Sequence, residues 1–165
     1  NEVEKIINEN NLNVQIANDN SPLQVVISGN KDEIINSKDT FIQNNIKKYV
    51  ELNVSAAFHS SHMLNAQNIL SAEIDKLNFN NNKIKIISNY NAQISNNIAE
   101  IKISLQNQMS NRVRWAESIK KLESIGEIKI IEIGPGKVLS GLIKRISNSF
   151  DITSINTIEK IKKYE

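Results

Sequence analysis

The residue types best suited to chemistry are the two histidines of the chain, which both lie in residues 54–63. His59 follows an apolar run and precedes small polar residues. That arrangement is typical of a general base at the rim of a sheet, where an imidazole can reach a nucleophile while substrate still has access. It also fits a packed or helix-capping histidine, since many titratable side chains are only structural. Residue type alone therefore leaves both interpretations of His59 open.

Length and composition restrict the possible classes of protein. The 165 residues, 39% of them hydrophobic, suffice for one globular domain or two small lobes. The net charge of +2 is spread along the chain and suggests neither nucleic acid nor an anionic membrane as a partner. The absence of cysteine excludes disulfides, thiolate catalysis and Cys-based metal sites, and we expect no metal site. No apolar run approaches the roughly 20 residues that span a bilayer, so we expect a soluble protein. Its compartment stays open between a bacterial cytoplasm and a plastid-type organelle matrix.

Apolar periodicity predicts a small lobe over residues 1–54. In order, we expect a helix at 2–10, a strand at 12–17, a turn at 18–22, a strand at 23–28, a helix at 31–48 and a strand at 49–54. The two adjacent strands favour a hairpin. Helix, strand, strand, helix, strand is a β-α-β-β-α-β ferredoxin-like unit without its first strand.

Residues 55–165 predict alternating helices and strands. We expect helices at 64–77, 96–109, 113–125, 138–147 and 158–163, with strands at 84–88, 127–133 and 153–155. The strand at 127–133 is rich in β-branched residues, which is typical of a parallel strand covered on both faces. The pattern predicts an α/β layer with parallel pairing.

The turn Gly134-Pro135-Gly136-Lys137 resembles a phosphate-binding loop but lacks its spacing. A P-loop needs four residues between its glycines and a Ser or Thr directly after the lysine, and neither condition holds here. We therefore interpret the stretch as a tight strand-to-helix turn in which glycine supplies unusual backbone angles.

Three separated motifs resemble one family. They are residues 18–29 (NDNSPLQVVISG), 57–63 (AFHSSHM) and 133–146 (IGPGKVLSGLIKRI). Together they resemble the carboxy-terminal half of malonyl-CoA:acyl carrier protein transacylases. The resemblance implies a partial α/β-hydrolase-like acyltransferase core in residues 55–165 and an incomplete ferredoxin-like subdomain in residues 1–54. It also implies an enzyme of fatty acid biosynthesis that uses malonyl-CoA and phosphopantetheinylated acyl carrier protein as substrates and no cofactor.

The resemblance assigns roles to two residues as catalytic. His59 matches the histidine that takes a proton from a serine nucleophile and later helps the phosphopantetheine thiol to attack the acyl ester. Gln108 matches a glutamine whose backbone carbonyl holds that histidine ring in place of an acidic residue. Such a carbonyl can fix the tautomer without adding charge beside an anionic substrate. Without the resemblance, Gln108 would be interpreted as a solvated residue at a helix end.

Other residues match the family less directly. Phe58 corresponds to an aromatic residue that accompanies malonyl selectivity, because a bulky ring excludes an α-methyl branch, although a plain core role fits it too. Asn18 and Asn20 match a hairpin turn aimed at the active-site cleft and are candidates for lining the substrate. His62 has no counterpart role and is expected to be a surface or capping residue.

The chain lacks several parts of the family's machinery. It contains no Gly-His-Ser-Leu-Gly nucleophile elbow and no amino-terminal Gly-Gln-Gly segment, and its three arginines do not match the clamp for the malonyl carboxylate. We therefore expect a fragment that is inactive alone and is completed by an amino-terminal half. Two alternatives stay open, a non-catalytic module that binds acyl carrier protein and the acyltransferase domain of a polyketide synthase.

Overall fold

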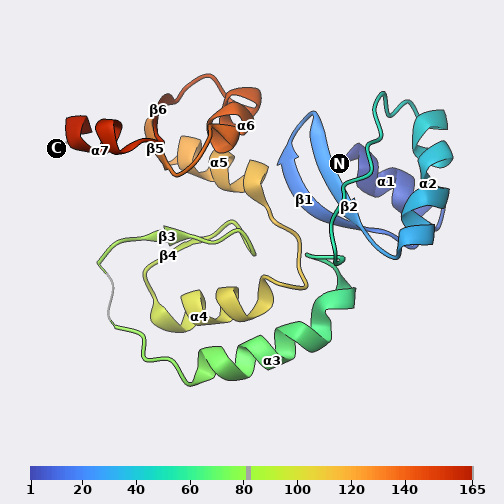
Figure 1. Ribbon diagram of the computed structural model, residues 1–165, viewed down its shortest axis with the longest axis horizontal. Helices are drawn as coiled ribbons and strands as arrows, with labels where there is room; N and C mark the ends of the chain where they lie inside the picture. Colours follow the sequence, from blue (N-terminus) through green and yellow to red (C-terminus); the bar gives the residue numbers. More distant parts are fainter. Residues whose placement is uncertain (81–82, 165) are drawn as a thin grey trace.

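The computed structural model describes residues 1–80 and 83–164 and shows a mixed α/β protein (Figure 1). Its helices are α1 (Glu2–Glu9), α2 (Lys31–Gln43), α3 (Leu64–Asp75), α4 (Ile98–Asn107), α5 (Trp115–Ser124), α6 (Val138–Ile146) and α7 (Ile158–Tyr164). Its strands are β1 (Gln15–Ser21), β2 (Gln24–Ser28), β3 (Ile86–Ile87), β4 (Ile94–Ser95), β5 (Lys129–Ile133) and β6 (Asp151–Ile155). All the helices expected from the sequence are present, with ends that differ by a few residues.

The first lobe is built on the antiparallel hairpin β1–β2, which confirms the expected pairing. Helices α1 and α2 pack against it through the buried side chains of Ile6, Val14 and Phe41. The expected turn at residues 18–22 is wrong, because β1 continues to Ser21 and the chain reverses at residues 22–23. The asparagines at positions 18 and 20 are therefore strand residues.

Strand β1 also binds a segment that is distant in sequence. Two register shifts interrupt its pairing with β2, and such bulges re-aim the side chains of a strand. The Val113 N–H donates to the Ala17 carbonyl (2.8 Å), and the Asp19 N–H donates to the Val113 carbonyl (2.9 Å). These bonds fix the connection between α4 and α5 against the hairpin.

The carboxy-terminal part contains the parallel pair β5–β6, as expected. Helix α6 follows β5 and buries Leu142 and Ile143. The turn between them has Gly134 at φ +139° and Gly136 at φ +85°, angles that side chains with a Cβ rarely adopt. This confirms the tight strand-to-helix turn.

The strand expected at 49–54 is wrong. Residues 46–54 form no helix or strand, and the side chains of Val50, Leu52 and Val54 are all more than half exposed. A strand forms only where a neighbouring backbone satisfies its hydrogen bonds, and no other described segment pairs with this stretch. The lobe therefore has the order helix, hairpin, helix, and the described residues contain no last strand of the expected ferredoxin-like unit.

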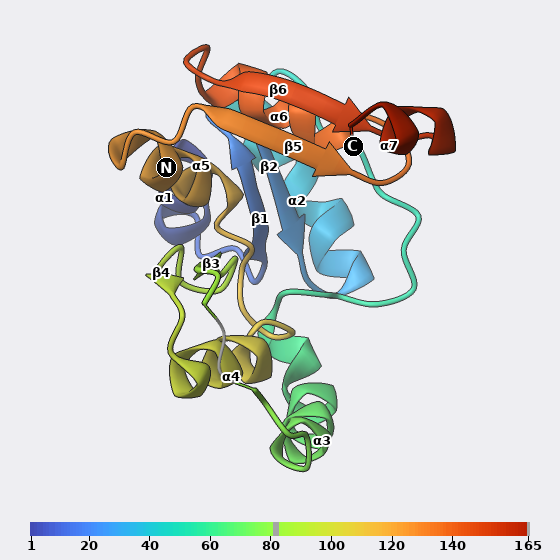
Figure 2. The same ribbon diagram turned by 90° about the vertical axis from the view of Figure 1, so that its left-hand side faces the viewer.

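Helices α3 and α4 lie side by side and form an arm at the opposite end of the molecule from β5 and β6 (Figure 2). The short ribbon β3–β4 lies between α3 and α4 in sequence, and β4 was not expected from the sequence. Helix α3 begins five residues after His59, and α4 ends just before Gln108. No helix among the described residues is long and apolar enough to cross a membrane.

Candidate active site

His59 lies on a tight loop that leads into a 3-10 turn (Ser61–Met63) and then into α3. Its backbone is left-handed, at φ +60°, a conformation that is uncommon for a residue other than glycine and is often found at functional sites. The neighbouring Ser60 is fully buried and its hydroxyl donates to the Ala57 carbonyl (2.6 Å). The loop is thus held by its own hydrogen bonds as well as by outside contacts.

The imidazole of His59 is half-buried, and its Nδ1 lies 3.0 Å from the backbone carbonyl oxygen of Gln108. The N–H of His59 donates to the next carbonyl, that of Met109, also at 3.0 Å. Since a carbonyl can only accept, the hydrogen of the neutral ring lies on Nδ1 in this contact. Nε2 then keeps its lone pair, so the arrangement can act as a general base through Nε2.

His59 lines a cavity of ≈ 700 Å³ between α1, the hairpin and the connection that follows α4. The residues around it are mostly polar and include His59, Gln15, Tyr90, Asn91, Arg112 and Arg114. Its volume is within the range of sites for small ligands. The structure therefore places His59 where a substrate or another polypeptide segment could reach it.

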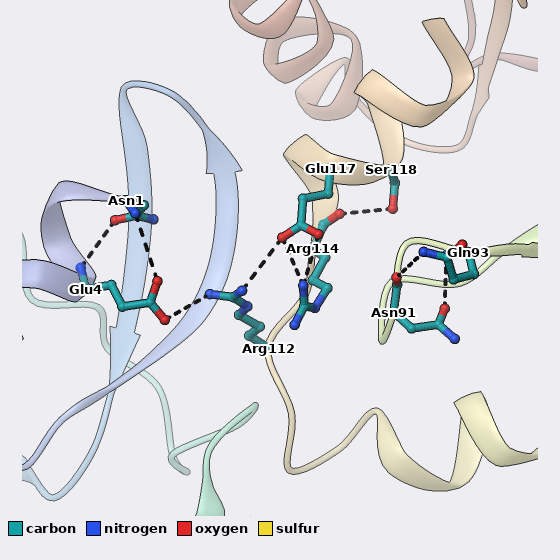
Figure 3. Close-up of polar contacts among 8 residues, drawn as sticks. All are labelled: Asn1, Glu4, Asn91, Gln93, Arg112, Arg114, Glu117 and Ser118. Carbon is teal, nitrogen blue, oxygen red and sulfur yellow. Dashed lines mark hydrogen bonds and ion pairs between the residues drawn. The ribbon is translucent and has the colours of Figure 1, made fainter. Parts of the chain in front are cut away.

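The two arginines at this cavity are already engaged (Figure 3). Arg112 lies 3.5 Å from Glu4 on α1 and 3.7 Å from Glu117 on α5. Arg114 binds both carboxylate oxygens of Glu117, at 3.1 and 2.9 Å. Both guanidinium groups thus pair with carboxylates of this chain.

Of the other candidates from the sequence, none lines this cavity. Phe58 is 48% exposed, so it is not a core residue. Asn18 pairs with Val26 within the hairpin, while Asn20 lies at a register shift of β1. His62 is exposed on the 3-10 turn, as expected. No group of side chains among the described residues could hold a metal ion.

Two glutamines that the sequence analysis did not single out contact the segments around His59. Gln15 binds Ser61, and Gln67 binds Ser110. Gln67 carried a signal, because it lies seven residues before the buried Ile74 and so shares the apolar stripe of α3. A polar side chain in such a stripe needs a buried partner. Gln15 alternates normally along its strand and carried no such signal.

Comparison with known proteins agrees with this geometry. The acyl transferase domain family matches residues 1–164. A malonyl CoA-acyl carrier protein transacylase of Bacillus subtilis (strain 168) is 37% identical over 159 residues, covering 96% of this chain and 50% of the relative. The polyketide biosynthesis protein PksE of the same organism is 40% identical over 149 residues, covering 89% of this chain and 19% of the relative.

A solved structure shows the same likeness in three dimensions. It is described as a type II polyketide synthase acyl-carrier protein in complex with its malonyl-transacylase. The match has a TM-score of 0.88 at 28% identity and covers 98% of this chain and 52% of the solved chain. The present chain belongs to the acyl transferase domain family. Its similarity extends over about half the length of the malonyl transacylases that it matches.

Proposed function

We propose that this chain is the base-supplying part of a malonyl-CoA:acyl carrier protein transacylase. The observation that carries the proposal is the contact between His59 Nδ1 and the Gln108 carbonyl, which leaves Nε2 available as a base. The identity to a malonyl transacylase over nearly the whole chain supports the same activity. The substrates would be malonyl-CoA and the phosphopantetheine thiol of acyl carrier protein.

The proposed reaction has two half-reactions. Nε2 of His59 first accepts the proton of a serine hydroxyl while the serine oxygen attacks the malonyl thioester carbonyl. Coenzyme A then leaves as a thiol, taking the proton back, and the malonyl group remains as a serine ester. In the second half, Nε2 accepts the proton of the carrier thiol, the sulfur attacks the ester, and the serine regains its proton. The Gln108 carbonyl stabilises the ring when it carries the extra proton.

The serine and the anion clamp are proposed to come from residues outside this chain. Its 165 residues contain no Gly-x-Ser-x-Gly elbow, which is the turn that exposes a serine in this kind of site. Its three arginines bind other side chains of this chain, since Arg112 and Arg114 pair with glutamates and Arg145 donates to Gln24. The ≈ 700 Å³ cavity beside His59 is where the nucleophile would enter. We accordingly expect residues 1–165 alone to be inactive.

Substrate choice is proposed to involve residues near the base. Phe58 directly precedes His59 in the loop, and its ring is half exposed. In a completed site, such a ring would narrow the space beside the α-carbon of the acyl group. Asn18 and Asn20 are on β1, next to the segment that contains Val113. They remain candidates for lining the substrate once the missing residues are in place.

A polyketide setting is the second candidate, favoured by the 40% identity to PksE. The chemistry at His59 would be the same, and only the carrier protein would differ. Transfer of malonyl to carrier proteins of fatty acid synthesis and of polyketide synthesis, compared by kcat/KM in the whole protein, separates the two settings.

The two histidines provide a matched test of the base. In the whole protein, His59→Ala is expected to lower kcat for malonyl transfer by about 10²–10⁴-fold. His62→Ala, three residues away and exposed, should leave it near the wild-type value. Equal activity in the two variants would contradict the proposal. Binding of acyl carrier protein without any transfer in the wild type would instead favour a non-catalytic carrier-binding module.

A further inference from the structure

The contact that orients His59 depends on two short backbone segments staying together. One is the loop at residues 57–61, and the other is the stretch at residues 108–110 after α4. Two bonds join them, from His59 Nδ1 to the Gln108 carbonyl and from the His59 N–H to the Met109 carbonyl. Because His59 has a left-handed backbone, the loop has no strong local preference for this shape. The Ser60 hydroxyl holds the loop from within, and contacts from elsewhere in the chain hold both segments further.

Gln67 on α3 holds the second segment. Its side chain is 7% exposed, and its Oε1 accepts from both the N–H (2.8 Å) and the hydroxyl (2.7 Å) of Ser110. A backbone N–H can only donate, so the amide orientation of Gln67 is fixed by this bond. Ser110 is itself buried, at 9% exposed. The bond therefore fixes the backbone two residues beyond the carbonyl that holds His59.

Gln15 on β1 holds the first segment. Its Oε1 accepts the N–H of Ser61 (2.9 Å), and its Nε2 donates to the Ser61 hydroxyl (2.6 Å). Both ends of one carboxamide are used on a single residue, two positions after His59. This contact is exposed to solvent, so water can replace it more easily than the buried contact of Gln67.

We propose that Gln67 and Gln15 are positioning residues for the His59–Gln108 pair, with Gln67 the more important of the two. Neither side chain is bonded to the imidazole, so they act through the backbone that they hold. The expected effect of these two glutamines on kcat rests on the proposed function. Their effect on the orientation of the His59 ring can be tested without assuming that function. Displacing a reacting group by about 1 Å can cost about 10²-fold in rate.

Ordinary helix packing does not require Gln67. An apolar side chain at this place in the stripe of α3 would pack without the cost of burying an amide. A second glutamine, Gln106, already joins α3 to α4, because it donates to the Ser71 carbonyl (3.3 Å) and to Asp75 (3.0 Å). Among the described residues, its side chain bonds to Ser71 and Asp75 and to none of residues 108–110. Gln106 is therefore a matched control at the same helix pair.

The kinetic test compares three variants of the whole protein in malonyl transfer. Gln67→Leu is expected to lower kcat about 10- to 100-fold with little change in KM, because Gln67 would not touch substrate. Gln67→Glu keeps an acceptor for Ser110 and should recover part of the loss. Gln106→Leu should stay close to wild type. Equal kcat losses for Gln67→Leu and Gln106→Leu, or none for Gln67→Leu, would overturn the role of Gln67.

A second readout reports the ring itself. The whole protein is labelled with ¹⁵N-histidine, and the His59 signals are assigned by their loss in His59→Gln. When the His59 ring is neutral, its hydrogen should reside on Nδ1 in the wild type. In Gln67→Leu, the neutral ring should be a mixture of the Nδ1–H and Nε2–H forms. His62 serves as the internal control.

The outcomes separate the two claims. If the wild type transfers no malonyl group, the proposed function fails. The tautomer of His59 in the ¹⁵N measurement still tests whether Gln67 and Gln15 position the ring. If Gln67→Leu does not fold, Gln67→Glu and Gln15→Ala are measured in its place. Gln15→Ala should give a smaller fraction of the Nε2–H form than loss of the Gln67 contact, because the Gln15 contact is exposed. An unchanged Nδ1–H form in every folded Gln67 and Gln15 variant would overturn the inference.

Discussion

At the scale of single residues, the site depends on a histidine whose ring contacts a backbone carbonyl and not an acidic side chain. The contact between His59 and Gln108 is 3.0 Å long. A carbonyl selects the Nδ1–H tautomer, as an aspartate would, but brings no formal charge. The oxygen that contacts His59 belongs to the Gln108 backbone and not to its side chain. The identity of the side chain at position 108 should therefore matter little for the orientation of the ring.

Replacing the side chain of Gln108 should therefore cost little. Within residues 1–80 and 83–164, the side chain donates only to the Asn111 carbonyl (3.1 Å), a bond typically worth about 1 kcal/mol. We expect Gln108→Leu to lower kcat for malonyl transfer less than about tenfold, far less than His59→Ala. Steady-state kinetics of the two variants check this. A loss in Gln108→Leu as large as that in His59→Ala would show that the side chain itself is required.

Phe58 gives a prediction about specificity. If its ring excludes an α-methyl branch, Phe58→Ala should raise the ratio of kcat/KM for methylmalonyl-CoA over malonyl-CoA by about tenfold or more. Competition between the two thioesters in the whole protein measures that ratio directly. Tyr90→Phe, which keeps an aromatic ring at the His59 cavity, is the control. An unchanged ratio in Phe58→Ala would remove Phe58 from the selectivity argument.

At the scale of elements, the sequence predicted most segments whose partners lie inside the chain, although it missed β4. The hairpin β1–β2, the helices and the parallel pair β5–β6 follow from periodicity and are confirmed. The expected strand at 49–54 has no partner among the described residues and does not form. The bond of Val113 to β1 was not predicted, because periodicity does not report which distant segments pair.

The candidate site was predictable only in part, for the same reason. His59 was visible as one of two histidines after an apolar run, and Gln108 only through the resemblance to a family. The structure brings these two together. Gln15 and Gln67 could not be placed, since their partners lie 46 and 43 residues away. Such contacts follow from packing and not from local pattern.

The core of the first lobe gives a test of stability. Phe41 is 2% exposed and packs against Ile6 and Val14. We expect Phe41→Ala to lower the free energy of unfolding by about 3–5 kcal/mol, because it leaves a cavity among packed side chains. The adjacent Ile42 is 45% exposed, so Ile42→Ala should cost only about 0.5 kcal/mol. Urea unfolding of both variants checks this, and equal costs would contradict the described core.

The turn before α6 gives a prediction about pH. Glu132 accepts from the hydroxyl and N–H of Ser140 and from the N–H of Leu139, so it caps the helix. The Ser140 hydroxyl is the largest cause that lowers the pKa of Glu132 below its ordinary value of 4.5. A lowered pKa in the folded state means that ionised Glu132 stabilises the fold above the unfolded-state pKa. This stabilisation is lost as the pH falls through the folded-state value.

Glu132→Gln should accordingly lower the melting temperature at neutral pH, by an amount that solvent screening keeps small. The difference in melting temperature between the variant and the wild type should narrow as the pH is lowered below 4.5. Thermal unfolding of the whole protein at a series of pH values measures this gap. Glu127→Gln removes an exposed carboxylate close to the same strand and is the control. A gap that is constant with pH would show that the charge of Glu132 does not contribute.

At the scale of the whole molecule, many large apolar side chains face solvent, and two groups of them bear on how the chain associates. One is the unpaired stretch with Val50, Leu52 and Val54, and the other is β5 and its approach, with Ile128 and Ile133. Exposed apolar surface next to unpaired strand edges favours association. The malonyl transacylases that match this chain are about twice as long. We propose that a segment equivalent to their additional half covers these two apolar surfaces.

Residues 1–165 expressed alone should therefore self-associate and bind a hydrophobic dye. Light scattering and dye fluorescence measure this, and adding the completing half should abolish both signals. A monomer that binds no dye would contradict the proposal that these surfaces are normally covered.

The most direct test of the central claim follows the first half-reaction. The whole protein is mixed with malonyl-CoA, quenched in acid and mapped by mass spectrometry. We expect a malonyl ester on a serine outside residues 1–165, formed about 10²–10⁴-fold more slowly in His59→Ala. An ester on a residue within this chain, or one that forms equally fast without the imidazole of His59, would contradict it.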